Sequence, residues 1–276
     1  MRLQRGQVAV VTGAASGLGL ALARAFAARG LDLVLADIEV DALDEAVAEV
    51  AETGADVIGV PTDVRSAAAL EGLASATINR FGRVDVICNN AGVVSFPGPT
   101  WEMDPNDWEW VRSVNLDGVV HGVRAFVPHL VAQGSGHVVN TASMAGISAG
   151  PGMAPYLVTK HAVVALTEGL AAELALAAPG VRASVVCPGQ VVTNIAASRR
   201  NQPEDLEADA PQMSAAEWDA FKAWHDSISH DRISADEAAE LVVEGMEADR
   251  LHIAPNGSSA GVRAWIDRLM VDVGDL

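Results

Sequence analysis

Two residues that can exchange a proton stand close together near the middle of the chain. The stretch APYLVTKHAV, residues 154–163, contains the single tyrosine, Tyr156, and one of only two lysines, Lys160. The stretch has a helical pattern, so side chains four residues apart share one face. A tyrosine ionises only at about pH 10, but a nearby cation lowers its pKa. The pair is therefore predicted to be a general acid and base, the alternative being an ordinary surface pair.

A glycine-rich turn near the N-terminus indicates a dinucleotide. The first strand-like run ends in TGAASGLG, residues 12–19, where Gly13, Gly17 and Gly19 precede a helix. Glycines in such a turn let the backbone N–H groups of a helix N-terminus approach a pyrophosphate. The spacing is G-x-x-x-G-x-G rather than the commoner G-x-G-x-x-G, and a simple tight turn is the alternative.

Asp37 ends the second strand-like run, about 20 residues after the glycines, where a carboxylate binds the adenosine ribose hydroxyls. The same carboxylate would repel a 2′-phosphate. Ile38 follows it and Ser16 lies in the turn, so we expect no cation nearby and predict NAD in preference to NADP. Asp37 is also placed to cap a helix, and both roles can hold together.

Two further strand ends are predicted to face the same ligand. Asp63, in TDV, is placed to meet the adenine edge, with a helix N-cap as its competing role. The motif NNAG, residues 89–92, permits left-handed backbone and a close pass by the cofactor. All these ends fall at the carboxyl edge of a parallel sheet, where ligands bind in open α/β folds.

The elements that must position these residues alternate along the chain. Short β-branched apolar runs bounded by Gly, Pro, Asn or Asp predict strands at 7–13, 31–37, 55–61, 84–90, 136–143, 181–189 and 251–255. Helical patterns between them cover 18–29, 39–52, 66–80, 105–133, 155–177 and 235–248. We therefore expect one α/β domain over residues 1–276, a doubly wound (Rossmann) seven-stranded parallel sheet with helices on both faces.

One long excursion, at about residues 194–232, interrupts this alternation. Connections of such length are often lids or binding loops, and we expect a substrate lid here. Within it Trp218, Phe221 and Trp224 recur at helical spacing. These aromatic side chains either anchor a short helix on the body of the protein or wall an apolar pocket, and the sequence favours neither.

The composition argues against several classes of protein. The net charge of −18 and the pI of about 4.6 disfavour nucleic acid as a partner, since phosphate binding needs clustered Lys and Arg. No apolar run reaches the roughly 20 residues of a membrane span, and the N-terminal stretch lacks a signal peptide's pattern. We expect a cytoplasmic protein with no membrane partner. Cys88 and Cys187 are predicted to be buried thiols, and the histidines show no metal-ligand spacing, so no metal site is expected.

Six motifs follow one another in a characteristic order between about residues 5 and 195. They are TGAASGLG, NNAG, VNLDG with Asn115, NTAS with Ser143, YLVTK, and PGQVVT at 188–193. This ordered set resembles the single-domain short-chain dehydrogenases/reductases. The resemblance implies that Asn115, Ser143, Tyr156 and Lys160 form a catalytic tetrad.

The resemblance gives each of these residues a role. Tyr156 takes a proton from an alcohol, or gives one to a carbonyl oxygen, while a hydride passes to or from the nicotinamide. Ser143 holds the substrate oxygen, and Lys160 also binds the nicotinamide ribose hydroxyls. Asn115 supports a water-linked proton relay to Lys160. The alternatives are that Ser143 caps a strand end and that Asn115 is a helix irregularity bonded to backbone.

The cofactor site implied by the motifs spans many strand ends. Val192 is expected to offer its backbone N–H to the carboxamide, and Pro188 either flanks the nicotinamide or only ends a strand. The predicted cofactor contacts are Gly13, Ser16, Gly17, Leu18, Gly19, Asp37, Ile38, Asp63, Val64, Asn90, Ala91, Gly92, Tyr156, Lys160, Pro188, Gly189, Val192 and Thr193.

The substrate pocket is predicted to be mostly apolar. Its expected residues are Ser95, Phe96, Met144, Ala145, Met153, Gln190 and Ile195. No Arg or Lys lies in the short loops near Tyr156, and Arg199 and Arg200 are expected to be solvated surface charges. We therefore predict an NAD(H)-dependent alcohol dehydrogenase or ketone reductase (EC 1.1.1.-) for a hydrophobic secondary alcohol and its ketone.

Two other functions and an oligomeric state complete the expectations. A hydroxysteroid dehydrogenase is the nearest alternative, and a non-catalytic NAD-binding regulatory protein is the alternative of another class, disfavoured by the intact tetrad. The helical segments 105–133 and 155–177 are apolar on more than one face, which favours subunit packing. The family is commonly dimeric or tetrameric, and we expect a homotetramer.

Overall fold

Seven parallel strands form the sheet that the sequence predicts. The computed structural model describes residues 2–227 and 232–257 and positions 259, 262, 263, 266, 267 and 270. The strand order is β3-β2-β1-β4-β5-β6-β7, and every neighbouring pair is parallel. The strands are β1 (Val8–Thr12), β2 (Asp32–Asp37), β3 (Val57–Pro61), β4 (Val86–Asn89), β5 (Gly136–Thr141), β6 (Val181–Val186) and β7 (His252–Ile253). The order reverses at β1, which pairs with both β2 and β4, and such a switch point places a ligand crevice at the carboxyl edge.

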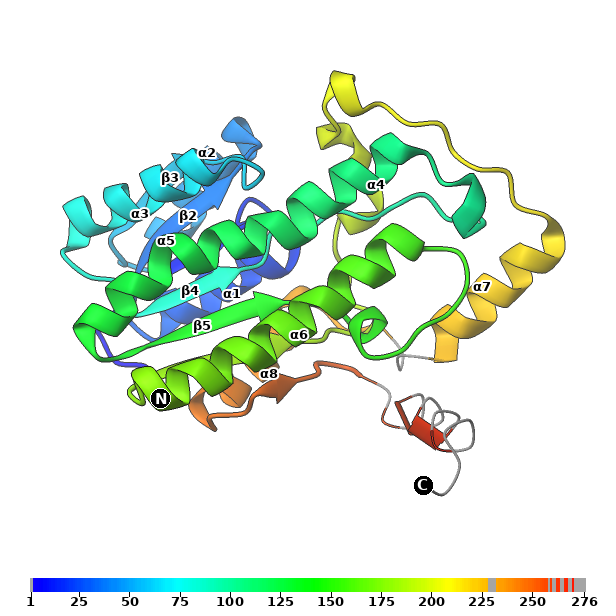
Figure 1. Ribbon diagram of the computed structural model, residues 1–276. Coiled ribbons are helices and arrows are strands. Elements are labelled where there is room, and N and C mark those ends of the chain that lie inside the picture. The colour runs from blue at the N-terminus through cyan, green and yellow to red at the C-terminus, as the bar shows by residue number, and fades with distance from the viewer. Residues whose placement is uncertain are drawn as a thin grey trace.

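Helices cover both faces of this sheet, as predicted. Helices α1 (Gly17–Ala28), α2 (Val40–Ala51) and α8 (Ala235–Glu247) share one core with the sheet. Helices α3 (Ala67–Phe81), α5 (Gly118–Gln133) and α6 (Ala154–Ala177) share the other. In Figure 1 the second group lies in front of the sheet, with α1 and α8 behind it.

Burial on both faces explains why the strands read as continuous apolar runs. All residues of β1, β4 and β5 are buried, which leaves no solvent face for alternating polar residues. The thiols of Cys88 and Cys187 are buried and free, as expected. Among the helices that the structure describes, none is both long and apolar enough to cross a bilayer.

The segment 105–133, predicted as one helix, is divided by a π-helical turn. Helix α4 (Pro105–Arg112) runs into the π turn η2 (Ser113–Asp117), and α5 follows directly. The helix begins where expected because Asp104 caps it and Pro105 occupies its first turn. Asn115 is fully buried within the π turn. Single π turns inside helices are frequent at functional sites, because they redirect side chains without ending the helix.

In its described residues, the excursion after β6 contains two 3₁₀ segments and one helix. The 3₁₀ segments η4 (Ile195–Asn201) and η5 (Glu204–Leu206) come first, and helix α7 (Ala215–Ser227) follows. Figure 1 shows the chain passing beside α4 and then extending to α7. Residues 228–231, which belong to the predicted excursion, lie outside the described residues. Trp224 packs so closely on Gly150 that a Cβ there would meet its ring at 2.1 Å, which supports the anchoring interpretation of the aromatic residues.

Candidate active site

The glycine turn between β1 and α1 leaves its backbone open toward a cleft. Gly13 and Gly17 have positive φ angles of 66° and 54°, a conformation that favours glycine. A Cβ on Gly19 would lie 2.0 Å from the carbonyl oxygen of Gly13. Within the described chain, the side chain of Ser16, the N-cap residue of α1, makes no capping bond. The first N–H groups of α1 can therefore bind an anion such as a pyrophosphate.

Asp37 ties this turn to the start of α2. Its Oδ2 accepts a hydrogen bond from the N–H of Ala15 at 2.9 Å, and its Oδ1 accepts one from Glu39 at 3.1 Å. The N-cap residue of α2 is Glu39, so Asp37 supports the helix start from two residues upstream. Each carboxylate oxygen keeps a lone pair with which it can accept a hydrogen bond from a ribose hydroxyl.

Asp63 is held by an arginine that the sequence interpretation did not include. Its carboxylate is paired with the Arg65 guanidinium through contacts of 2.7 to 3.1 Å. The N-cap of α3 is Ser66, whose hydroxyl accepts from the N–H of Ala69 at 3.2 Å. The alternative of an N-cap role for Asp63 is therefore wrong.

One cleft at the carboxyl edge of the sheet brings most of the predicted residues together. Of the expected cofactor and catalytic residues, it is lined by Gly13, Ser16, Gly17, Leu18, Gly19, Asp37, Ile38, Asp63, Val64, Asn90, Ala91, Gly92, Ser143, Tyr156, Lys160, Pro188, Gly189 and Thr193. Its lining also includes Glu39, Arg65, Trp110, Val114, Ser198, Arg200 and Asn201, which the sequence did not indicate. The glycine turn, the Asp37 carboxylate and the Tyr156–Lys160 pair thus line one open cleft.

Val192 is the one predicted cofactor residue outside this lining. Its N–H, expected to serve the carboxamide, donates to the carbonyl oxygen of Ile233 at 2.9 Å. The bond belongs to a short parallel bridge between Val191 and Ile233. The bridge therefore occupies the donor that sequence reasoning assigned to the ligand.

Tyr156, Lys160 and Ser143 meet where β5 ends beside the first turns of α6. Lys160 Nζ lies 5.6 Å from the centre of the Tyr156 ring and donates to the carbonyl oxygen of Thr141 at 2.9 Å. Ser143 follows β5, and its hydroxyl accepts a hydrogen bond from the N–H of Ala145 at 3.1 Å. The hydroxyl thus acts as a cap after the strand, as the alternative interpretation of Ser143 had it, and Ser143 also lines the cleft.

Burial is the largest influence on the pKa values of Tyr156 and Lys160. Burial raises the pKa of the Tyr156 phenol, and a hydrogen bond with the Ser143 side chain lowers it in part. Burial also lowers the pKa of the Lys160 ammonium to about 8. The lowering of the Tyr156 pKa that we expected from Lys160 is therefore outweighed by burial.

Asn115 binds backbone from within the π turn. Its Oδ1 accepts a hydrogen bond from the N–H of Val93 at 2.8 Å, and its Nδ2 donates to the carbonyl oxygen of Val93 at 2.9 Å. A Cβ on Gly92 would lie 3.4 Å from both Asn115 Oδ1 and Lys160 Nζ. Asn115 thus shapes the loop that separates it from Lys160, which agrees with the backbone-bonding alternative.

Most of the predicted substrate residues do not line this cleft. Ile195 lines the cleft, whereas Ser95, Phe96, Met144, Ala145, Met153 and Gln190 do not. Met144 and Ala145 are buried in the core beside α6, because the turn after Ser143 folds inward. Gln190 contacts the excursion and the residue after it, since its side-chain amide lies 3.5 Å from a ring nitrogen of His225 and its carbonyl oxygen accepts from the N–H of Ile233.

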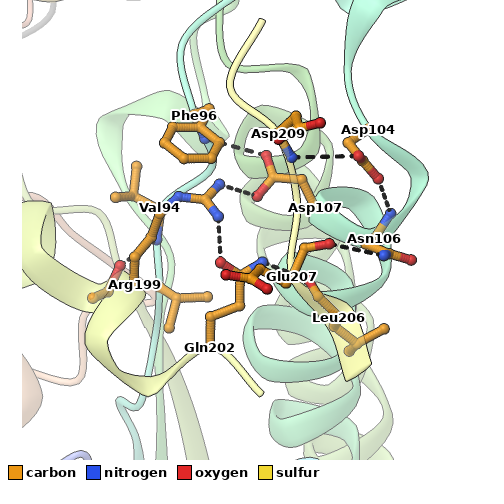
Figure 2. A network of polar contacts seen from close by, with 12 residues as sticks. Val94, Phe96, Asp104, Asn106, Asp107, Arg199, Gln202, Leu206, Glu207 and Asp209 are labelled. Carbon is orange, nitrogen blue, oxygen red and sulfur yellow. Dashed lines mark hydrogen bonds and ion pairs between the residues drawn. The ribbon is translucent and has the colours of Figure 1, made fainter. Parts of the chain in front are cut away.

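Phe96 is covered by an arginine from the excursion, as Figure 2 shows. The Arg199 guanidinium lies 3.1 Å from the centre of the Phe96 ring, and it is paired with the carboxylate of Asp107. Asp107 also accepts a hydrogen bond from the Phe96 N–H at 3.2 Å, and only 1% of its side chain is exposed. Burial lowers the pKa of Arg199 and raises that of Asp107, and their mutual attraction opposes both changes. The prediction that Arg199 is a solvated surface charge is wrong.

Further contacts hold the excursion along α4. Ser198 Oγ accepts from the N–H of Val94 at 3.2 Å. Asn106 Nδ2 donates to the carbonyl oxygen of Glu207 at 2.9 Å (Figure 2). The excursion therefore contacts both the loop after β4 and the first turn of α4.

Arg200, the next residue, reaches the opposite wall of the cleft. Its Nε donates to Glu39 Oε2 at 3.1 Å, and its Nη2 is paired with Glu39 Oε1. The side chain of Arg200 is 39% exposed and lines the cleft that contains Asp37. The expectation of no cation near Asp37 is therefore wrong, because chain segments 161 residues apart meet here.

Known proteins with similar sequences and structures cover most of the chain. The family model described as short chain dehydrogenase matches residues 7–204. The 1-deoxy-11-beta-hydroxypentalenate dehydrogenase of Streptomyces avermitilis is 40% identical over 253 residues, which cover 91% of this chain and 85% of that protein. The 3beta-hydroxysteroid dehydrogenase 2 of Eggerthella lenta is 38% identical over 200 residues, 72% of this chain and 76% of that protein. A short chain dehydrogenase/reductase of Burkholderia phymatum, solved in complex with NAD, is 41% identical with a TM-score of 0.84 over 92% of this chain and 90% of its own.

Proposed function

Because the chain belongs to the short-chain dehydrogenase family, and is thus an oxidoreductase, we propose that it interconverts a hydrophobic secondary alcohol and its ketone with NAD. The observation that carries this proposal is the shared cleft. Ser143, Tyr156 and Lys160 line it together with the glycine turn and the Asp37 carboxylate. A proton-exchanging pair and a dinucleotide cradle in one cleft suit hydride transfer coupled to proton transfer.

The residues of the chain divide the work in the following way. Tyr156 Oη takes the proton of the alcohol or returns it to the carbonyl oxygen. Ser143 Oγ holds that oxygen by a hydrogen bond while its charge changes. Lys160 binds the ribose of the cofactor and stabilises the phenolate form of Tyr156 by its charge. NAD, when bound, supplies the hydride acceptor and a positive charge beside the phenol.

The Asp37 carboxylate supports NAD in preference to NADP, since it would repel a 2′-phosphate. The NAD complex of the similar Burkholderia phymatum protein agrees with that preference. Two buried free thiols suit a reducing compartment, and we place the protein in the cytoplasm. In the cell this cofactor would favour oxidation of the alcohol.

A hydroxysteroid is the second candidate for the substrate. The similar Eggerthella lenta protein is by name a 3beta-hydroxysteroid dehydrogenase. The Streptomyces avermitilis relative carries the name of a hydroxylated carboxylate, so hydroxy acids belong among the compounds tested. We also propose a homotetramer, supported by apolar side chains exposed along α6, among them Val158 and Leu176. Sedimentation velocity that finds only monomer would contradict it.

Replacing the phenol tests the mechanism. Wild type and Tyr156→Phe are assayed by NADH absorbance with secondary alcohols, hydroxysteroids and hydroxy acids. We expect wild-type oxidation of at least one compound and a loss of at least about 100-fold in the variant, the order that general acid–base catalysis contributes. Calorimetric NAD binding should remain, because the phenol is not its main contact. An active Tyr156→Phe enzyme, or a wild type that binds NAD but oxidises nothing, would contradict the proposal, the latter favouring the regulatory alternative.

A further inference from the structure

Glu39 is the point at which the excursion is fastened to the adenosine end of the cleft. Its carboxylate binds the Arg200 guanidinium through both oxygens, and Oε1 also accepts from Asn201 Nδ2 at 2.7 Å. Arg200 lowers the pKa of Glu39, so the carboxylate is charged at neutral pH. Both side chains are partly exposed, which leaves the pair open to exchange with a ligand's charge.

The pair lies directly beside the residue that faces the adenosine ribose in the proposed complex. Glu39 is two residues past Asp37, and its N–H donates to Asp37 Oδ1 at 3.1 Å. Asp37, Glu39, Arg200 and Asn201 line the same cleft. The Arg200 guanidinium is therefore present at the end where NAD carries a ribose hydroxyl and NADP carries a phosphate dianion.

This cation alone would favour the phosphate. A free guanidinium binds phosphate strongly, in a bidentate manner, and it would offset the repulsion by Asp37. In the structure the guanidinium is already engaged by Glu39. Binding of a 2′-phosphate by Arg200 would require the arginine to leave this carboxylate and would place a second anion near Glu39.

We propose that Glu39 is a second residue that determines cofactor specificity, an inference that rests on the proposed dependence on NAD. Glu39 holds Arg200 away from a 2′-phosphate, and Asp37 repels that phosphate directly. Two carboxylates thus discriminate against NADP: Asp37 repels the phosphate, and Glu39 keeps Arg200 in an ion pair.

Binding measurements separate this role from a purely structural one. The dissociation constants of NAD and NADP are measured by calorimetry for wild type, Glu39→Gln, Glu39→Ala and the matched control Asp41→Asn. Asp41 is an exposed carboxylate in the first turn of α2, so the control removes the same charge nearby without touching Arg200. We expect NADP to bind about tenfold more tightly to both Glu39 variants, which is the order of the attraction between a phosphate and one unpaired cation at a partly exposed site. The dissociation constant of NAD should change less than about twofold. The control should behave as wild type.

A double variant assigns the gain to the arginine. In Glu39→Gln/Arg200→Leu the tighter NADP binding should disappear. A gain that persists there, or an NADP constant unchanged in both Glu39 variants, overturns the inference. Weaker NAD binding in both Glu39 variants, without a gain for NADP, would show that Glu39 only fastens the excursion and would overturn it as well. If wild type binds NAD but oxidises no alcohol, only the proposed function is contradicted. If wild type binds neither nucleotide, the proposed function and the role of Glu39 are both contradicted.

Discussion

At the scale of single residues, the Arg199–Asp107 ion pair joins a mostly buried arginine of the excursion to a buried aspartate of α4. The Asp107 side chain is 1% exposed and that of Arg199 is 22% exposed. Burying two charges costs free energy that their attraction and hydrogen bonds must offset. The pair is therefore a weak source of net stability, whereas loss of one partner leaves an uncompensated charge inside the protein.

Three variants test this difference between removing one charge of the pair and removing both. Arg199→Met should lower the free energy of unfolding by about 3 kcal/mol, because the Asp107 carboxylate loses its partner. Adding Asp107→Asn should recover most of that loss, since an amide oxygen still accepts from Phe96 and carries no charge. Arg112→Met is the matched control, because its pairs with Glu109 and Asp117 lie at the surface and should be worth less than about 1 kcal/mol. Urea unfolding checks all three, and equal losses in Arg199→Met and Arg112→Met would contradict the argument.

Sequence reasoning found residues whose chemistry is local and missed those whose chemistry depends on distant partners. Tyr156 and Lys160 lie one helical turn apart, so their proximity follows from the helix itself. Arg199 and Asp107 are 92 residues apart, and both types favour the surface when read alone. Arg199 lies over the rings of Phe96 and Trp110, which belong to distant segments, so the stretch around residue 199 held no signal of this contact.

At the scale of elements, the boundaries of helices followed from their terminal residues, but the interior of the long segment 105–133 did not. Asp104 and Pro105 mark the start of α4, and Gly134 ends α5 in a left-handed conformation. The π turn at Ser113–Asp117 depends on the contact of Asn115 with Val93, a loop residue 22 positions away. No helical periodicity carries that information, so the segment reads as one helix.

Two glycines of α3 should respond in opposite directions to the same substitution. Gly72 lies inside the helix, is exposed, and has nothing within 4 Å of an added Cβ. Gly72→Ala should raise the free energy of unfolding by about 0.5 to 1 kcal/mol, because alanine loses less backbone entropy in a helix. Gly82 ends the helix at a φ of 71°, also with free space around it. Gly82→Ala should lower the free energy of unfolding by about 1 kcal/mol through backbone strain alone.

Chemical unfolding of the two variants side by side checks this difference. Each variant controls for the other, since the added methyl group, the element and the open surroundings are the same. A stabilising Gly82→Ala would mean that α3 ends differently from the structure.

At the scale of the whole molecule, the carboxyl and amino edges of the sheet carry different groups. The carboxyl edge holds the cleft, whereas His137 is buried near the amino end of β5. Ser184 Oγ donates its proton to the carbonyl oxygen of Arg250 at 2.6 Å, so at 2.8 Å from the ring it accepts from His137 Nε2. His137 Nε2 therefore carries a proton, and among the described residues Nδ1 has no hydrogen-bond partner. Burial lowers the pKa of His137 from 6.5 to about 4.

This depressed pKa makes the stability of the protein sensitive to mild acid. Below pH 6.5 the unfolded chain protonates His137 while the folded chain does not until about pH 4. The stability is thus fully present above pH 6.5 and falls by up to about 3 kcal/mol as the pH approaches 4. In His137→Gln, urea unfolding between neutral pH and pH 4 should show a fall smaller by this amount, whatever the offset at neutral pH. The control His129→Gln, at an exposed position of α5, should show the same loss of stability in acid as wild type. If His137→Gln also lost as much stability as wild type between neutral pH and pH 4, the folded protein would bind the His137 proton as readily as the unfolded chain does.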